Sequence, residues 1–130
     1  MGATRPYADS RPLSIETVTL DPPGPGEVQV RIRAAGLCHS DLSVVSGDGR
    51  RPLAVGLGHE AAGEVEVLGE GVEDLAVGDH VVMVFMPSCG HCAPCAEGRP
   101  ALCEPGAAAN GRGELLTGAH RLHAEGETLN

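Results

Sequence analysis

The chain has 130 residues, of which 42% are hydrophobic, and a formal net charge of −9 from 18 acidic residues set against nine arginines. This length suits one domain with a modest core, and the negative charge disfavours nucleic acid and anionic membrane surfaces as partners. No apolar stretch approaches the length of a membrane span, and the first residues lack the basic-then-apolar pattern of a secretion signal. We therefore expect a cytoplasmic protein that binds neither nucleic acid nor a membrane.

The first half of the chain predicts short β-strands separated by turns rich in glycine and proline. Residues 13–20 have a β-like apolar pattern, and residues 21–26 (DPPGPG) form a turn. Residues 27–33 (EVQVRIR) alternate strictly between polar and apolar side chains, which is the clearest strand pattern in the chain. Residues 40–45 fit a short helix.

The second half continues with strands and then changes character. Residues 63–68 (GEVEVL) alternate again, a turn is expected near residues 77–79, and the apolar run 81–86 (VVMVFM) predicts a buried strand. Residues 87–113 are dominated by Cys, Gly, Pro and Ala, which predicts a loop that needs an external cross-link to hold it in place. Several short strands at this spacing predict a mainly β domain, either a barrel or a rolled sheet.

Four of the five cysteines form a compact motif. Cys89, Cys92, Cys95 and Cys103 have the spacing C-x2-C-x2-C-x7-C, which lets four thiolates surround one zinc ion and leaves no open coordination position. A closed site of this kind is structural. Two disulfides and an iron–sulfur cluster are the alternatives. The adjacent x2 spacings, which strain loop closure, and the expected reducing compartment disfavour the disulfides, and the last spacing disfavours the cluster. His91 is expected to be a surface residue.

The fifth cysteine, Cys38, follows the clearest strand and stands apart from the others. A buried packing role is the alternative for a free cysteine, because free cysteines are among the most buried residues. Its neighbours favour a functional role: Ser40 and Asp41 are polar where apolar packing would continue. About twenty residues later, His59 and Glu60 form another polar pair between small residues.

Together these motifs resemble the N-terminal catalytic domain of zinc-dependent, medium-chain alcohol dehydrogenases. GHEAAG at residues 58–63, followed by Gly69 and Val72, matches that family's zinc signature G-H-E-x2-G-x5-G-x2-V. The motif around Cys38 and the four-cysteine motif lie in the expected order, and the resemblance extends from about Leu13 onward. It implies a GroES-like, partly open β-barrel with short helices and a zinc-stapled lobe within residues 87–113.

The resemblance also implies a catalytic zinc site. Cys38 and His59 would be ligands of the catalytic zinc, and Glu60 would lie just behind the ion. Asp41 would orient the His59 imidazole from outside the coordination sphere. Zinc would therefore be both a structural and a catalytic cofactor.

Substrate and cofactor roles follow from the same resemblance. Ser40 would hydrogen-bond the substrate hydroxyl, and His39 would lie close to the cofactor pyrophosphate. The family interconverts alcohols and aldehydes or ketones with NAD or NADP, and the parent enzyme is expected to be a homodimer or homotetramer. Ser43 replaces a relay histidine found in many members, so the outer proton path is expected to differ.

Part of the family's machinery would follow residue 130. The third protein ligand of the catalytic zinc and the nucleotide-binding Rossmann domain fall there, so residues 1–130 are expected to be one incomplete GroES-like domain that is inactive by itself. Three alternatives stay open from the sequence: a non-catalytic zinc-binding interaction module, a formaldehyde dehydrogenase acting on a thiol adduct, and a carbonyl reductase.

Overall fold

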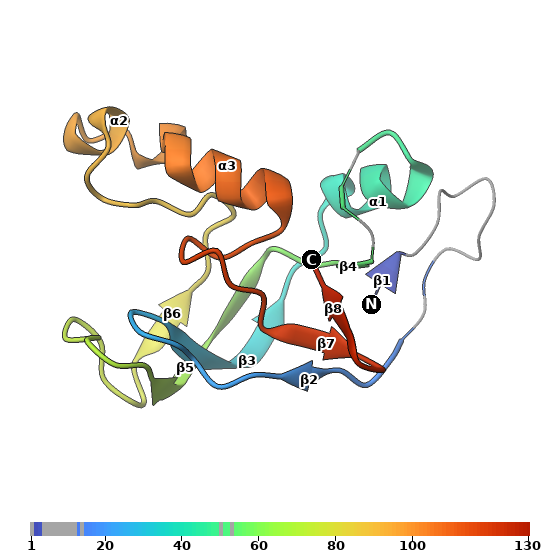
Figure 1. Cartoon of the computed structure of the whole chain (residues 1–130), viewed down its shortest axis with the longest axis horizontal. Helices are drawn as coiled ribbons and strands as arrows, with labels where there is room; N and C mark the ends of the chain where they lie inside the picture. Colours follow the sequence, from blue (N-terminus) through green and yellow to red (C-terminus); the bar gives the residue numbers. More distant parts are fainter. Residues whose placement is uncertain (1, 4–12, 14, 50, 53) are drawn as a thin grey trace.

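The computed structural model describes residues 2–3, 13, 15–49, 51–52 and 54–130. Within them the chain forms three small antiparallel sheets and three short α-helices (Figure 1). The predicted mainly β fold with short helices is confirmed. In this part of the chain, no helix has the length and apolar character that a bilayer-spanning helix requires.

The largest sheet has the strand order β3-β5-β6. Its strands are β3 (Val28–Ala35), β5 (Ala61–Leu68) and β6 (His80–Val82). The strands predicted at 27–33 and 63–68 are thus confirmed, and both extend toward the end of the sheet at which Ala35 pairs with Ala61. Two register shifts in β3 interrupt the regular alternation, and the side chain of Ile32 is 47% exposed.

The two other sheets are smaller. One contains β2 (Thr19–Leu20), β7 (Leu122–Ala124) and β8 (Glu127–Leu129), and the other pairs β1 (Gly2–Ala3) with β4 (Val55–Gly56). The expected β pattern over residues 13–20 is therefore realised only at β2, and residue 14 lies outside the described residues. The predicted turns at 21–26 and 77–79 are present, with φ of +72° at Gly26 and +95° at Gly78.

The buried strand predicted at residues 81–86 is wrong in both length and burial. Strand β6 ends at Val82, because its partner β5 begins at Ala61, whose carbonyl accepts the last cross-strand hydrogen bond from Met83. Beyond that point the ladder has no partner. The side chains of Val84 and Phe85 are 78% and 48% exposed.

The loop predicted at residues 87–113 is largely helical. It contains α2 (Ala93–Ala96), a 3-10 turn (Pro100–Leu102) and α3 (Glu104–Arg112), which lie together at one side of the molecule (Figure 1). Proline stands in the first turn of each element, where it costs no hydrogen bond, and Gly113 ends α3 with φ of +73°. The glycines within this segment obscured its helical pattern in the sequence. We call residues 87–113 the cysteine lobe.

Helix α1 (His39–Ser46) begins at the residue after Cys38 and confirms the short helix predicted near residues 40–45. The described core is small. Its buried side chains are Val45 from α1, Val55 from β4, Val65 from β5, and Cys103 and Ala109 from the cysteine lobe.

Candidate functional site

The structure brings together the four cysteines of the lobe. Their Sγ atoms lie within 4.8 Å of one another, from Cys89 after β6, Cys92 and Cys95 at α2, and Cys103 at the start of α3. Cys103 is completely buried and the other three are half-buried. The backbone N–H groups of Cys89 and Gly106 each donate to Cys103 Sγ at 3.2 Å, so that its position is fixed by the fold.

The surroundings shift two of these thiols in opposite directions. The backbone N–H groups of His91 and Cys92 lower the pKa of Cys89 to about 6, whereas burial and the neighbouring Cys92 thiol raise the pKa of Cys95 to about 11. A divalent cation deprotonates a coordinating thiol outright and would hold all four sulfurs as thiolates. The His91 ring is exposed, with Nδ1 2.8 Å from the carbonyl oxygen of Cys89, as expected of a surface residue.

A second donor cluster lies at the end of the largest sheet. Because Ala35 and Ala61 are paired, the residues just after β3 and just before β5 meet at this end. One ligand atom each from Cys38, His59 and Glu60 lies within 4.8 Å of the others. The sequence analysis predicted all three as metal-site residues, and the structure brings them together.

Asp41 links two of these donors. Its Oδ2 accepts a hydrogen bond from the Cys38 backbone N–H at 3.2 Å, and its Oδ1 lies 3.2 Å from His59 Nδ1. A proton on Nδ1 then leaves the Nε2 lone pair of His59 available, and Nε2 faces the Ser40 hydroxyl at 3.3 Å. This arrangement of thiol, imidazole and carboxylate suits a zinc ion.

The electrostatics of the cluster favour charged forms. The Ser40 hydroxyl, followed by the Ser40 backbone N–H and the His59 ring, lowers the pKa of Cys38. The hydrogen bond to Cys38, followed by the negative charge of Asp41, raises the pKa of His59. Both shifts favour the charged forms of the thiol and the imidazole, and binding of a cation would release protons from this pair.

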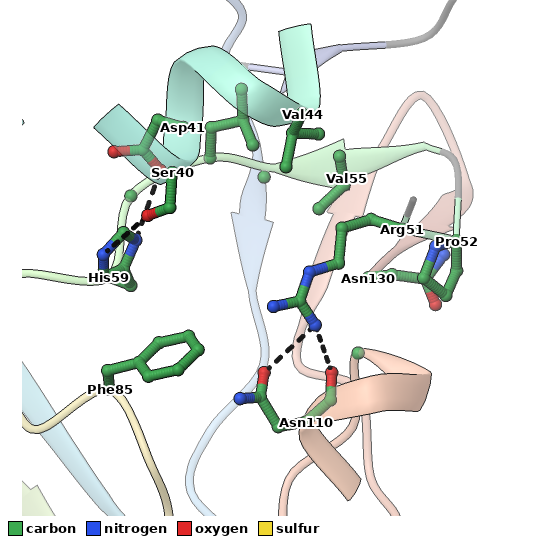
Figure 2. Close-up of a pocket in the computed structure, with 14 residues that line it drawn as sticks. Ser40, Asp41, Val44, Arg51, Pro52, Val55, His59, Phe85, Asn110 and Asn130 are labelled. Atoms are coloured by element: carbon green, nitrogen blue, oxygen red, sulfur yellow. Dashed lines mark hydrogen bonds and ion pairs between the residues drawn. The ribbon is translucent and has the colours of Figure 1, made fainter. Parts of the chain in front are cut away.

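Ser40, Asp41 and His59 line one side of a cleft of about 210 Å³ (Figure 2). The edge of the Phe85 ring meets the His59 ring, with centroids 5.2 Å apart and planes at 66°. The full lining comprises Ser40, Asp41, Val44, Arg51, Pro52, Val55, Gly56, Leu57, Gly58, His59, Phe85, Asn110, Gly113 and Asn130.

Three conspicuous members of this lining were missed from the sequence: Arg51, Phe85 and Asn110. Phe85 could have been singled out because it is the only Phe in the chain. No local sequence pattern connects Arg51 to Asn110, which lies 59 residues away. His39, expected beside the cofactor, is exposed as the first residue of α1. The Ser43 hydroxyl donates to the His39 carbonyl oxygen at 3.2 Å.

A family model described as the alcohol dehydrogenase GroES-like domain matches residues 24–125. The chain belongs to this family. The GroES-like fold expected from the sequence is therefore confirmed.

Among the proteins similar in sequence is the S-(hydroxymethyl)glutathione dehydrogenase of Aspergillus oryzae, with 42% identity over 95% of this chain and 32% of the relative. The NDMA-dependent alcohol dehydrogenase of Amycolatopsis methanolica is 42% identical over 92% of this chain and 32% of its own length. The chain thus spans about a third of the length of these curated relatives.

Solved structures show the same relationship. The chain superimposes on an alcohol dehydrogenase zinc-binding domain protein from Burkholderia ambifaria with a TM-score of 0.81 and 46% identity, over 89% of this chain and 31% of the other. Benzyl alcohol dehydrogenase from Acinetobacter calcoaceticus gives a TM-score of 0.73 and 39% identity, over 81% of this chain and 29% of that enzyme.

Proposed function

We propose that this chain is the zinc-binding catalytic domain of a zinc-dependent alcohol dehydrogenase, which interconverts alcohols and aldehydes or ketones with NAD or NADP. The observation that carries the proposal is the convergence of Cys38, His59 and Glu60 beside Ser40 at the edge of a cleft. The relatives named as dehydrogenases support the same reaction class. Cytoplasmic location and a dimeric or tetrameric parent stay predictions.

In this proposal Cys38 and His59 would hold the catalytic zinc, and Glu60 would be able to approach it during ligand exchange. Zinc supplies Lewis acidity, which lowers the pKa of an alcohol or polarises a carbonyl group. Asp41 keeps the proton on His59 Nδ1, so that Nε2 stays a ligand. Glu60 is the most accessible of the three donors, since its side chain is 51% exposed.

Ser40 and His39 have separate parts in the proposal. The Ser40 hydroxyl lies on the cleft wall, 3.3 Å from His59 Nε2. There its oxygen can accept a hydrogen bond from the hydroxyl group of a substrate. His39 stands at the exposed first turn of α1, where backbone N–H groups favour the pyrophosphate of a cofactor.

The cysteine lobe has a structural role in the proposal. Cys89, Cys92, Cys95 and Cys103 would hold a zinc ion with four thiolates, which would leave no ligand position for substrate. Because these ligands come from the segment after β6, from α2 and from the start of α3, they would tie the three segments together when zinc is bound.

Metal stoichiometry tests the proposal directly. We expect the purified chain to bind two zinc ions, and Cys38→Ala to bind one, as measured by elemental analysis after equilibration with zinc. With cobalt in place of zinc, the thiolate-to-metal absorption of the second site should also disappear in Cys38→Ala. Ser46→Ala, at the exposed end of α1, is the matched control and should retain both ions.

The alternatives give different results. One zinc per chain, unchanged by Cys38→Ala, would replace the catalytic proposal with a non-catalytic zinc-binding interaction module. The Aspergillus relative's name supports the thiol-adduct alternative within the family, and rates with S-(hydroxymethyl)glutathione, primary alcohols and aldehydes would separate the three substrate classes in the parent enzyme.

The chain assayed alone with alcohol and NAD or NADP should transfer no hydride. Every strand pair described in it is antiparallel, whereas dinucleotides bind at parallel sheets.

A further inference from the structure

Arg51 differs from the other arginines in the part of the chain that the structure describes. Each of the others forms an ion pair with a glutamate: Arg31 with Glu66, Arg33 with Glu64, Arg99 with Glu97, Arg112 with Glu114, and Arg121 with Glu27. Arg51 instead donates from Nη1 to the backbone oxygen of Asn110 at 3.0 Å and to its Oδ1 at 3.4 Å. Its positive charge therefore has no carboxylate partner among the described residues.

The position of Arg51 makes this exception meaningful, because Arg51 lines the same cleft as the candidate catalytic residues. Figure 2 shows its guanidinium reaching into the cleft from the side opposite Ser40 and His59, with Asn110 holding one edge of the fork. The two hydrogen bonds to Asn110 use only Nη1, so that Nη2 and Nε keep their donors.

Among the residues that the structure describes, no carboxylate side chain forms an ion pair with Arg51. Asp41 is the one carboxylate side chain in the lining, and its two oxygens are already engaged with the Cys38 N–H and the His59 ring. A half-buried charge without a partner is unfavourable, and an anionic ligand would relieve that cost. The planar fork of arginine matches the oxygens of a carboxylate or a phosphate and is already oriented by Asn110.

We propose that Arg51 is a specificity residue that binds an anionic oxygen group, a carboxylate or a phosphate, at the far end of the substrate. The reacting carbon of the same molecule would lie beside Ser40 and His59. The substrate class is thus an alcohol or aldehyde with an anionic tail. This inference rests on the proposed function, since it assigns the reacting end to the zinc site.

Binding to the zinc-loaded chain tests the inference. The probes are 6-hydroxyhexanoate, 6-hydroxyhexyl phosphate and neutral hexan-1-ol, together with shorter and longer members of each series, titrated by calorimetry. We expect at least one anionic series to bind about tenfold or more tightly than its neutral counterpart, because a charge-assisted hydrogen bond contributes that much. The anionic series with the larger gain in affinity over the neutral alcohols identifies the tail as a carboxylate or a phosphate.

Variants assign the preference to its residue. Arg51→Gln should reduce the anionic-to-neutral affinity ratio to near one, and Arg51→Lys should retain much of it, because lysine keeps the charge without the fork. Arg33→Gln is the matched control: Arg33 is exposed on β3, is paired with Glu64, and does not line the cleft. The anionic-to-neutral affinity ratio of Arg33→Gln should equal that of the wild-type chain.

Two results would overturn the inference. One is an unchanged chain that binds neither anionic series more tightly than the neutral alcohols. The other is a preference that survives in Arg51→Gln, which would place the anion on the zinc ion or elsewhere. Zinc content measured on the same samples tests the proposed function separately, because absence of the second zinc ion would contradict that proposal. The inference about Arg51 is tested only by the ratio of anionic to neutral affinities.

Discussion

At the scale of single residues, Asp41 shows how one carboxylate can organise a site that it does not need to ligate. It contacts the backbone of Cys38 through one oxygen and the ring of His59 through the other, and its side chain is only 18% exposed. The contact with His59 favours a proton on its Nδ1, and the contact with Cys38 lies at the start of α1. The sequence analysis assigned this orienting role to Asp41, and the geometry supports it, while the role itself stays a prediction.

We expect Asp41→Asn to weaken zinc or cobalt binding at the Cys38–His59 site about 10- to 100-fold, the usual effect of removing an outer-sphere partner. A competition titration against a chromophoric chelator would measure this loss. Asp48→Asn is the control, because Asp48 is exposed beyond α1 and bonds the Ser46 hydroxyl. Equal affinities in the two variants would contradict the orienting role.

At the scale of elements, the cysteine lobe depends on a close approach of backbones. Gly106 lies in the first turn of α3, is buried, and donates its N–H to Cys103 Sγ. A Cβ atom added there would collide with the Pro87 carbonyl oxygen and lie 3.2 Å from Cys103 Sγ. The glycine therefore allows the chain after β6 to pass against α3.

Gly106→Ala should destabilise the lobe by about 1–3 kcal/mol, as expected for an overpacked site, and should weaken binding of the structural zinc. Urea unfolding and zinc competition measure the two effects. Gly111→Ala is the matched control in the same helix, since an added Cβ meets nothing within 4 Å, and it should stabilise by about 0.5–1 kcal/mol. Similar losses in both variants would contradict the close-approach explanation.

At the scale of the whole molecule, Glu27 ties the start of β3 to the C-terminal part of the chain. It accepts hydrogen bonds from Arg121 Nε at 2.8 Å, from the Thr117 hydroxyl at 2.7 Å and from the Gly24 N–H at 2.8 Å. Arg121, as the largest cause, lowers the pKa of Glu27 from 4.5 to about 2. This network links residues that are 90 and 94 positions apart in the sequence.

The network predicts a pH dependence of stability. Because the pKa of Glu27 is lower in the folded chain, its contribution should be full above about pH 4.5 and should be lost as the pH falls toward 2. Glu27→Gln should lower the free energy of unfolding by about 1–3 kcal/mol at pH 7 and by much less near pH 2, as measured by urea unfolding. A cost independent of pH would show that packing, and not charge, explains the effect.

The sequence by itself determined the features that depend on short-range order. The spacing of the four cysteines, the polar pairs near Cys38 and His59, and the alternation of residues 27–33 and 63–68 are local patterns, and the mainly β fold follows from them. Such patterns survive folding because the backbone geometry of a turn or strand is set within a few residues.

Only the tertiary structure decided what depends on neighbours in space. Residues 81–86 were too apolar to appear exposed from the sequence, yet their strand ends where β5 offers no further partner. Helix α3 forms despite its two internal glycines, because Cys103 caps it and its Sγ accepts a hydrogen bond from the Gly106 N–H. Arg51 likewise acquires its role from Asn110 and the cleft, since a charge shows whether it is paired only once the chain has folded.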